Sequence, residues 1–119
     1  MKLNEYQEKA MGTCLPESEN VSYMLLNLVG EVGEFSSKFA KAIRKKQVFI
    51  VSNQLCYDGD FDSTEFEDEL KKEAGDIFWQ LSGLCEIMGW PLEEVAQVNL
   101  DNLASRQIRN EIDGDGDNR

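Results

Sequence analysis

Two pairs of acidic residues stand three positions apart on segments with a helical pattern. Glu31 and Glu34 lie in LVGEVGEF, and Glu73 and Asp76 lie in KKEAGDIFW. The i, i+3 spacing puts both acids of a pair on one face of a helix. Two such helices packed together would present four carboxylates to one point, where only protons or hard cations would relieve their repulsion. Magnesium is the expected occupant, because it prefers carboxylate oxygens.

Two long helices are predicted to carry these pairs, one from Val21 to about Lys46 and one from Ser63 or Thr64 to about Met88. Apolar residues at intervals of three and four give each helix a core-facing stripe. In the first helix the stripe is Val21, Leu25, Leu28, Val32, Phe35, Phe39 and Ile43. In the second it is Phe66, Leu70, Ala74, Ile77, Leu81, Leu84 and Met88.

One polar edge borders each stripe. The first edge is Asn27, Glu31, Glu34 and Lys38, and the second is Glu69, Glu73, Asp76 and Gln80. Both edges have the same rotational sense on a helical wheel. Two antiparallel helices are related by an approximate two-fold axis, so edges of equal sense emerge on the same side. The two acid pairs are therefore expected to meet.

Shorter elements complete an all-α chain. A helix is expected from about Leu3 to Thr13, ending before Leu15 because Pro16 disfavours a helical conformation in the residue that precedes it. Ser18 or Asn20 would cap the next helix. The helical period is lost over 47–61, where VFIV has strand propensity and DG signals a turn, so an irregular or small hairpin connection is expected. A weaker helical pattern runs from Leu92 to about Ile108. The 119 residues are predicted to form a single domain, 1–119.

Composition excludes several kinds of chemistry. The chain has no histidine, which excludes Ser-His-Asp and Cys-His catalysis and disfavours a zinc site. Its net charge of −11 argues against nucleic-acid and anionic-membrane partners. Three widely spaced cysteines suit reduced thiols, with Cys85 in the core. No run of 18 apolar residues is present, so a cytoplasmic protein is expected.

A second metal motif competes with the acid pairs. Asp58, Asp60, Asp62 and Glu69 match positions 1, 3, 5 and 12 of a calcium-binding EF-hand loop. Position 6, where the loop requires glycine, is Ser63. The preceding segment also has a strand-like pattern instead of a helical one, so the acid pairs are the favoured site.

Several segments together resemble the MazG-like nucleotide pyrophosphohydrolases, within the all-α NTP pyrophosphatase group. They are GEVGEF, EAGDIFWQL, NLDNLASR and the closing GDGDNR, with the early Tyr6-Gln7. The resemblance implies a four- to five-helix bundle that assembles as a homodimer or homotetramer. It also implies magnesium-dependent hydrolysis of nucleoside triphosphates to monophosphate and pyrophosphate, with Mn²⁺ as a substitute for Mg²⁺.

The resemblance also assigns residue roles. The metal ligands would be Glu31, Glu34, Glu73 and Asp76, and Glu34 is the preferred general base. Substrate contacts are expected from Lys38, Gln80, Asn99, Arg106 and Arg119. Relatives commonly carry Lys three residues after Asn99 and Tyr at position 80, whereas this chain has Asn102 and Gln80. Arg109 is a further candidate for the missing phosphate contact.

A non-enzymatic function is the alternative. Scattered surface acids on a chain of this charge would suit a nucleic-acid mimic that occupies a basic partner, or a degenerate family member. An enzyme should gain thermal stability from magnesium as the cation fills its site, whereas a mimic should show only weak screening.

Overall fold

A computed structural model describes residues 1–109 of the chain. Its elements are α1 (Leu3–Met11), a 3₁₀ turn (Pro16–Ser18), α2 (Val21–Arg44), β1 (Val48–Val51), β2 (Gln54–Tyr57), α3 (Ser63–Ile87) and α4 (Leu92–Ile108). The all-α class and the small hairpin between the two long helices are confirmed. No helix within these residues has the length and apolar character needed to cross a membrane.

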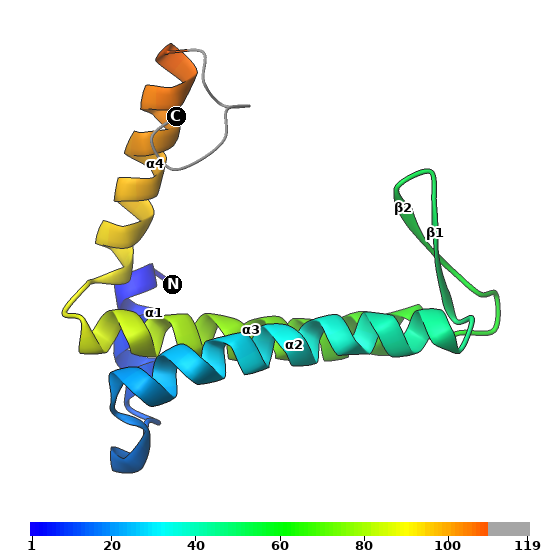
Figure 1. Cartoon of the computed structure of the whole chain (residues 1–119), viewed down its shortest axis with the longest axis horizontal. Helices are drawn as coiled ribbons and strands as arrows, with labels where there is room; N and C mark the ends of the chain where they lie inside the picture. The colour runs from blue at the N-terminus through cyan, green and yellow to red at the C-terminus, as the bar shows by residue number, and fades with distance from the viewer. Residues whose placement is uncertain (110–119) are drawn as a thin grey trace.

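The antiparallel pair α2–α3 forms the long axis of the protein (Figure 1). Each helix begins at a capping side chain that accepts a backbone N–H. Asn20 caps α2 by accepting from Tyr23, and Asp62 caps α3 by accepting from Glu65. Such caps satisfy amide groups that have no partner inside the helix. Of the two capping residues considered for α2, Asn20 is therefore the one used.

Polar side chains tie α1 to one end of this pair. Trp79 donates its indole N–H to the Ala10 carbonyl at 3.1 Å and to the Thr13 hydroxyl at 3.0 Å. The buried amide of Gln7 donates to the Trp90 carbonyl and accepts from the Leu92 backbone N–H. The turn between α3 and α4 is thus held to α1, and α4 rises from this end away from the α2–α3 pair (Figure 1).

The hairpin rises from the other end of the pair (Figure 1). Its register pairs Val48 with Tyr57 and Val51 with Gln54. Ser52 and Asn53 turn the chain with left-handed φ values of 52° and 61°. Val48 is fully buried, but the other residues of β1 are exposed. The hairpin is thus anchored at its base, and most of its apolar surface is uncovered.

The apolar stripe of α2 is wider than the surface that α3 covers. Val21, Leu25, Val32 and Ile43 are each 44–50% exposed, so the expectation that they face a core within the chain is wrong. Leu26 and Val29 extend the exposed face, at 73% and 71%. The radius of gyration is 17.8 Å, against roughly 13–14 Å for a compact domain of this length. A face of this kind is typical of a surface that another chain covers.

Candidate functional site

Three of the four predicted acids meet between α2 and α3. Glu31 from α2 and Glu73 and Asp76 from α3 each offer a carboxylate oxygen, and these oxygens lie within 4.8 Å of one another. The i, i+3 spacing places Glu73 and Asp76 on one face of α3. The antiparallel packing of the helices brings Glu31 opposite them. We refer to Glu31, Glu73 and Asp76 as the acid cluster.

Glu34 lies beside the acid cluster without being part of it. Its side chain is exposed, and it stands one turn after Glu31 on α2. The charge of Glu34 contributes to a raised pKa at Glu31, after desolvation by burial. Glu34 is therefore close enough to act on the same ligand as the acid cluster, and it faces solvent.

Burial raises the free-energy cost of ionising the carboxylates of the acid cluster. The largest cause of the raised Glu31 pKa is desolvation, followed by the charges of Glu34 and Asp76. One Glu31 oxygen accepts a hydrogen bond from the Asn27 amide at 3.2 Å. The other Glu31 oxygen, Oε2, and Oε2 of Glu73 are buried and have no hydrogen-bond partner within residues 1–109. Buried carboxylate oxygens without partners are costly unless a proton or a cation satisfies them.

The acid cluster fits a hard divalent cation by these criteria. It offers only oxygen donors, from three carboxylates on two rigid helices. Two of its oxygens lack any other partner among residues 1–109, and both belong to residues that face each other across the helix pair. Magnesium and manganese accept such donors, whereas the absence of histidine and of a nearby thiolate disfavours zinc.

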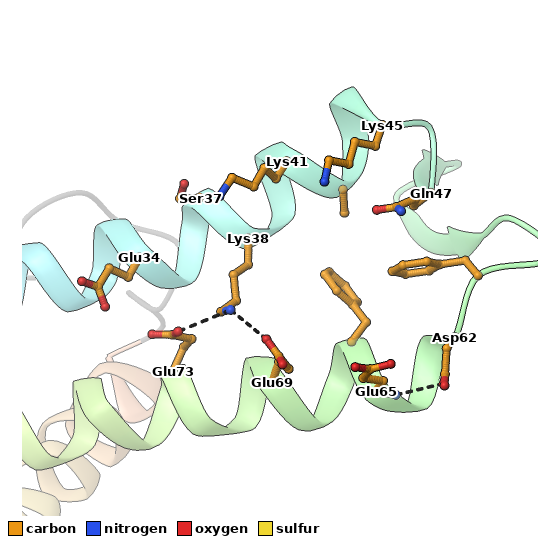
Figure 2. A pocket seen from close by; sticks show the side chains of 13 residues that line it. Glu34, Ser37, Lys38, Lys41, Lys45, Gln47, Asp62, Glu65, Glu69 and Glu73 are labelled. Carbon is orange, nitrogen blue, oxygen red and sulfur yellow. Dashed lines mark hydrogen bonds and ion pairs between the residues drawn. The ribbon is translucent and has the colours of Figure 1, made fainter.

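Lys38 supplies a positive charge next to the cluster. Its ammonium lies 2.9 Å from Glu69 Oε2 and 3.6 Å from Glu73 Oε1, so it bridges two turns of α3 (Figure 2). The hydrogen bond to Glu69 raises the pKa of Lys38 and lowers the pKa of Glu69. Lys38 thus offsets part of the negative charge at Glu73.

A cavity of about 610 Å³ opens beside the acids, toward the hairpin end of the pair. Glu34 and Glu73 line its acid end, and Phe61 and Phe66 line it farther along. One wall comes from the C-terminal half of α2, and the other from the N-terminal half of α3 (Figure 2). The cavity is large enough for part of a nucleotide. Two of the predicted acids, Glu34 and Glu73, form part of its lining.

Other predicted substrate contacts lie elsewhere. Gln80 is 1% exposed, where its amide accepts from Asn27 at 2.9 Å and contacts Met24, so it positions Asn27 from inside the helix pair. Asn99 and Arg106 are on α4, which stands away from the α2–α3 pair (Figure 1). Arg119 lies outside the described residues.

The EF-hand alternative is not supported by the described residues. Asp62 caps α3, and the aspartates at 58, 60 and 62 do not gather into a group that could hold a metal. Segment 47–61 forms the hairpin and its exit, where an EF-hand would have a helix.

Sequence reasoning did not single out two features of the site. Tyr6 lies close enough to Asp76 for that charge to contribute to its raised pKa, after desolvation, and its ring is 4.6 Å from that of Phe78. Lys41 and Lys45 line the cavity with Lys38. The spacing of the lysines was a readable signal, since positions 38, 41 and 45 share one helix face. No pattern in the sequence links Tyr6 to Asp76.

The chain is thus an all-α protein with a carboxylate cluster between two antiparallel helices. Residues 19–109 match the MazG nucleotide pyrophosphohydrolase domain, so the chain belongs to this family. It is also 37% identical over 101 residues to the Gene 37 protein of Mycobacterium phage L5, covering 85% of this chain and 78% of that protein. No solved structure matches the chain.

Proposed function

We propose that this protein hydrolyses nucleoside triphosphates, NTPs or dNTPs, to the monophosphate and pyrophosphate in a magnesium-dependent reaction. The observation that carries the proposal is the acid cluster, in which two buried carboxylate oxygens lack partners in a chain of the MazG family. A triphosphate would be repelled by a protein of net charge −11 unless cations at the site offset the repulsion.

Each acidic residue has a proposed role. Glu31, Glu73 and Asp76 would hold Mg²⁺, or Mn²⁺ in its place, and Glu34 would complete the ligand set or accept a proton. The bound metal would supply positive charge for the phosphates and acidify a water molecule. Asn27, itself held by Gln80, orients Glu31.

The reaction is attack of water on the α-phosphorus. A new P–O bond forms to the water oxygen, and the bond between the α-phosphorus and the bridging oxygen to the β-phosphorus breaks. Glu34 is exposed next to the cluster and is the proposed acceptor of the water proton. Pyrophosphate leaves with the electron pair of the broken bond.

A homodimer or homotetramer is part of the proposal. The exposed apolar face of α2, from Val21 to Val32, lies on the side of the helix away from Glu34 and Lys38. A second copy that covers this face would leave the cavity open. It would also bring another α4, with Asn99 and Arg106, into the assembly. We also propose a cytoplasmic location.

The proposal is tested by measuring pyrophosphate and monophosphate release from a panel of canonical and modified NTPs and dNTPs. Each reaction is run with Mg²⁺, with Mn²⁺ and with chelator. Glu73→Ala should lower release about a thousandfold, whereas Asp68→Asn, an exposed acid on the same helix, should behave as wild type. Absence of release from every nucleotide at high protein concentration would overturn the proposed activity and leave a family member that does not hydrolyse them.

A further inference from the structure

Positive charge is concentrated in one short segment of this acidic protein. Five of the twelve lysines and arginines lie within nine residues at the end of α2. They are Lys38, Lys41, Arg44, Lys45 and Lys46. Of these, Lys38, Lys41 and Lys45 line the cavity that begins at the acid cluster. We refer to these three residues as the lysine row.

The helix dipole alone does not account for the lysine row. Cations in the last turn of a helix are stabilised by its negative C-terminal end, which explains the basic character of residues 41–46. The dipole has no preference for one face, however, and Lys38 lies well before the end of α2 at Arg44. The spacing of three and four residues directs all three side chains into one cavity.

The lysine row continues the acid edge of α2. Along the helix axis, Lys38, Lys41 and Lys45 follow Glu34 by about 6, 10 and 16 Å, at about 1.5 Å per residue. In Figure 2 the Lys41 side chain runs back along α2 toward Ser37, and so toward the acid end. A phosphate chain that starts at the acids and follows α2 would therefore come within reach of Lys38 and then Lys41.

Two members of the row have charge available for a ligand. Lys38 is paired with Glu69 and Glu73, but Lys41 and Lys45 form no ion pair within residues 1–109. The opposite wall of the cavity carries Glu65 and Glu69 from α3. An anion in the cavity is thus attracted to the α2 wall and repelled by the α3 wall, which fixes the side on which it lies.

The other direction along the helix pair is closed. Beyond Glu31, the space between α2 and α3 is filled by Met24, Asn27 and the buried Gln80. Arg106 is on α4 and Arg109 follows its last residue, and α4 stands away from the α2–α3 pair (Figure 1). Among residues 1–109, the lysine row is therefore the set of cations that borders both the acids and an open cavity.

From this arrangement, and resting on the proposed function, we infer that the lysine row is an anion subsite for the β- and γ-phosphates of the substrate. After cleavage the same residues hold the departing pyrophosphate. Lys38 exchanges its carboxylate partners for the β-phosphate, Lys41 meets the terminal phosphate, and Lys45 adds positive charge at the far end of the cavity. The nucleoside then leaves the helix pair toward solvent, past the exposed Glu34 and Asp76, and recognition of the triphosphate is independent of the base.

The test compares pyrophosphate with nucleoside monophosphate as ligands. Calorimetry measures the binding of each, with Mg²⁺ present, to the wild type and to the double variant Lys41→Met/Lys45→Met. The inference expects pyrophosphate to bind about tenfold more weakly to the variant, and the monophosphate to bind equally well to both. Lys9→Met/Lys71→Met is the matched control, because Lys9 and Lys71 are exposed helical lysines outside the cavity.

The possible outcomes distinguish a failure of the subsite from a failure of the proposed function. Unchanged pyrophosphate binding by the variant, with wild-type hydrolysis intact, overturns the subsite and leaves the function standing. Weaker monophosphate binding with unchanged pyrophosphate binding places the nucleoside at the lysines and also overturns it. Lysine-dependent pyrophosphate binding by a protein that hydrolyses no nucleotide supports the subsite and overturns the function. A circular dichroism melt confirms that the exposed substitutions preserve the fold.

Discussion

The acid cluster and the lysine row share one edge of α2 and one cavity, but they are built differently. The carboxylates of Glu31 and Glu73 are partly buried, and Asn27 and Lys38 contact them. Lys41 and Lys45 are exposed, without ion pairs in the described chain. Desolvated, positioned groups suit the reacting centre, whereas flexible exposed cations suit the capture of a charged ligand. One edge of α2 thus carries the proposed reacting centre at one end and the lysines proposed to attract the charged ligand at the other.

The largest expected effect comes from the buried end. Glu73→Ala removes a carboxylate that lies in the acid cluster and has one oxygen without a partner. Because the metal site would be lost, we expect hydrolysis to fall about a thousandfold, which is about 4 kcal/mol of barrier. The measurement is pyrophosphate release together with a Mg²⁺ titration of the melting temperature. Activity within threefold of wild type would remove Glu73 from the site.

Glu34→Gln should separate proton transfer from metal binding. Glu34 is exposed and lies outside the cluster, so its amide should leave the three clustered carboxylates in place. Loss of a general base typically costs about a hundredfold or more in rate. We expect that loss while the Mg²⁺-induced rise in melting temperature persists. A variant that loses both the rate and the rise would make Glu34 a metal ligand instead.

Lys38→Met should have an intermediate effect, because Lys38 lies where the two regions meet. Its contacts with Glu69 and Glu73 are lost, and so is the proposed contact with the β-phosphate. We expect KM for the triphosphate to rise about tenfold, with a smaller change in kcat. Steady-state kinetics test this, with Lys71→Met as the control. A fall in kcat without a change in KM would show that Lys38 stabilises the transition state instead of binding the substrate.

The smallest effect is on stability, at Glu31. Its pKa is raised above the ordinary value of 4.5, mainly by burial, so the folded protein keeps this proton at pH values where the unfolded chain releases it. The contribution of this group to stability is full below about pH 4.5 and is lost as the pH rises through the folded pKa. In chelator at pH 7, Glu31→Gln should therefore melt about 3–5 °C above wild type.

The difference in melting temperature between wild type and Glu31→Gln should disappear at low pH. As the pH falls below about 4.5, the melting temperatures of wild type and Glu31→Gln should converge, since Glu31 becomes protonated in both folded and unfolded wild type. Thermal melts from pH 4 to 7 in chelator test the trend. A difference between the two proteins that is independent of pH would indicate altered packing instead of altered charge.

The helices and the acid cluster followed closely from the sequence. Periodicity predicted α2, α3 and α4 to within about two residues. The equal sense of the acid edges predicted that the two acid pairs would meet, and three of the four acids do. Periodicity does not report how much of a stripe one neighbour can cover, and so Val21 and Val32 were assigned to a core that they do not reach. An apolar stripe this wide packs against α3 on one side and leaves room for another surface to pack on the other side.

Side-chain placement within the site was less predictable. Glu34 shares the acid edge with Glu31, yet it lies outside the cluster, because a position on a helical wheel leaves the rotamer open. Gln80 shares the edge with Asp76, yet it turns inward to bond Asn27 and Met24. Long polar side chains at the edge of a core can point into the core or out to solvent. The choice depends on partners from another helix.

The two tryptophans provide an optical consequence of the fold. Trp79 donates its indole N–H to α1, and Trp90 lies in the turn that Gln7 holds. Both therefore report on the junction of α1, α3 and α4, and neither lines the cavity. Detachment of α1 would move Trp79 into water and shift its fluorescence to longer wavelength, whereas melting of the hairpin alone would leave the emission unchanged. Intrinsic fluorescence and far-ultraviolet circular dichroism would then follow separate parts of the same unfolding reaction.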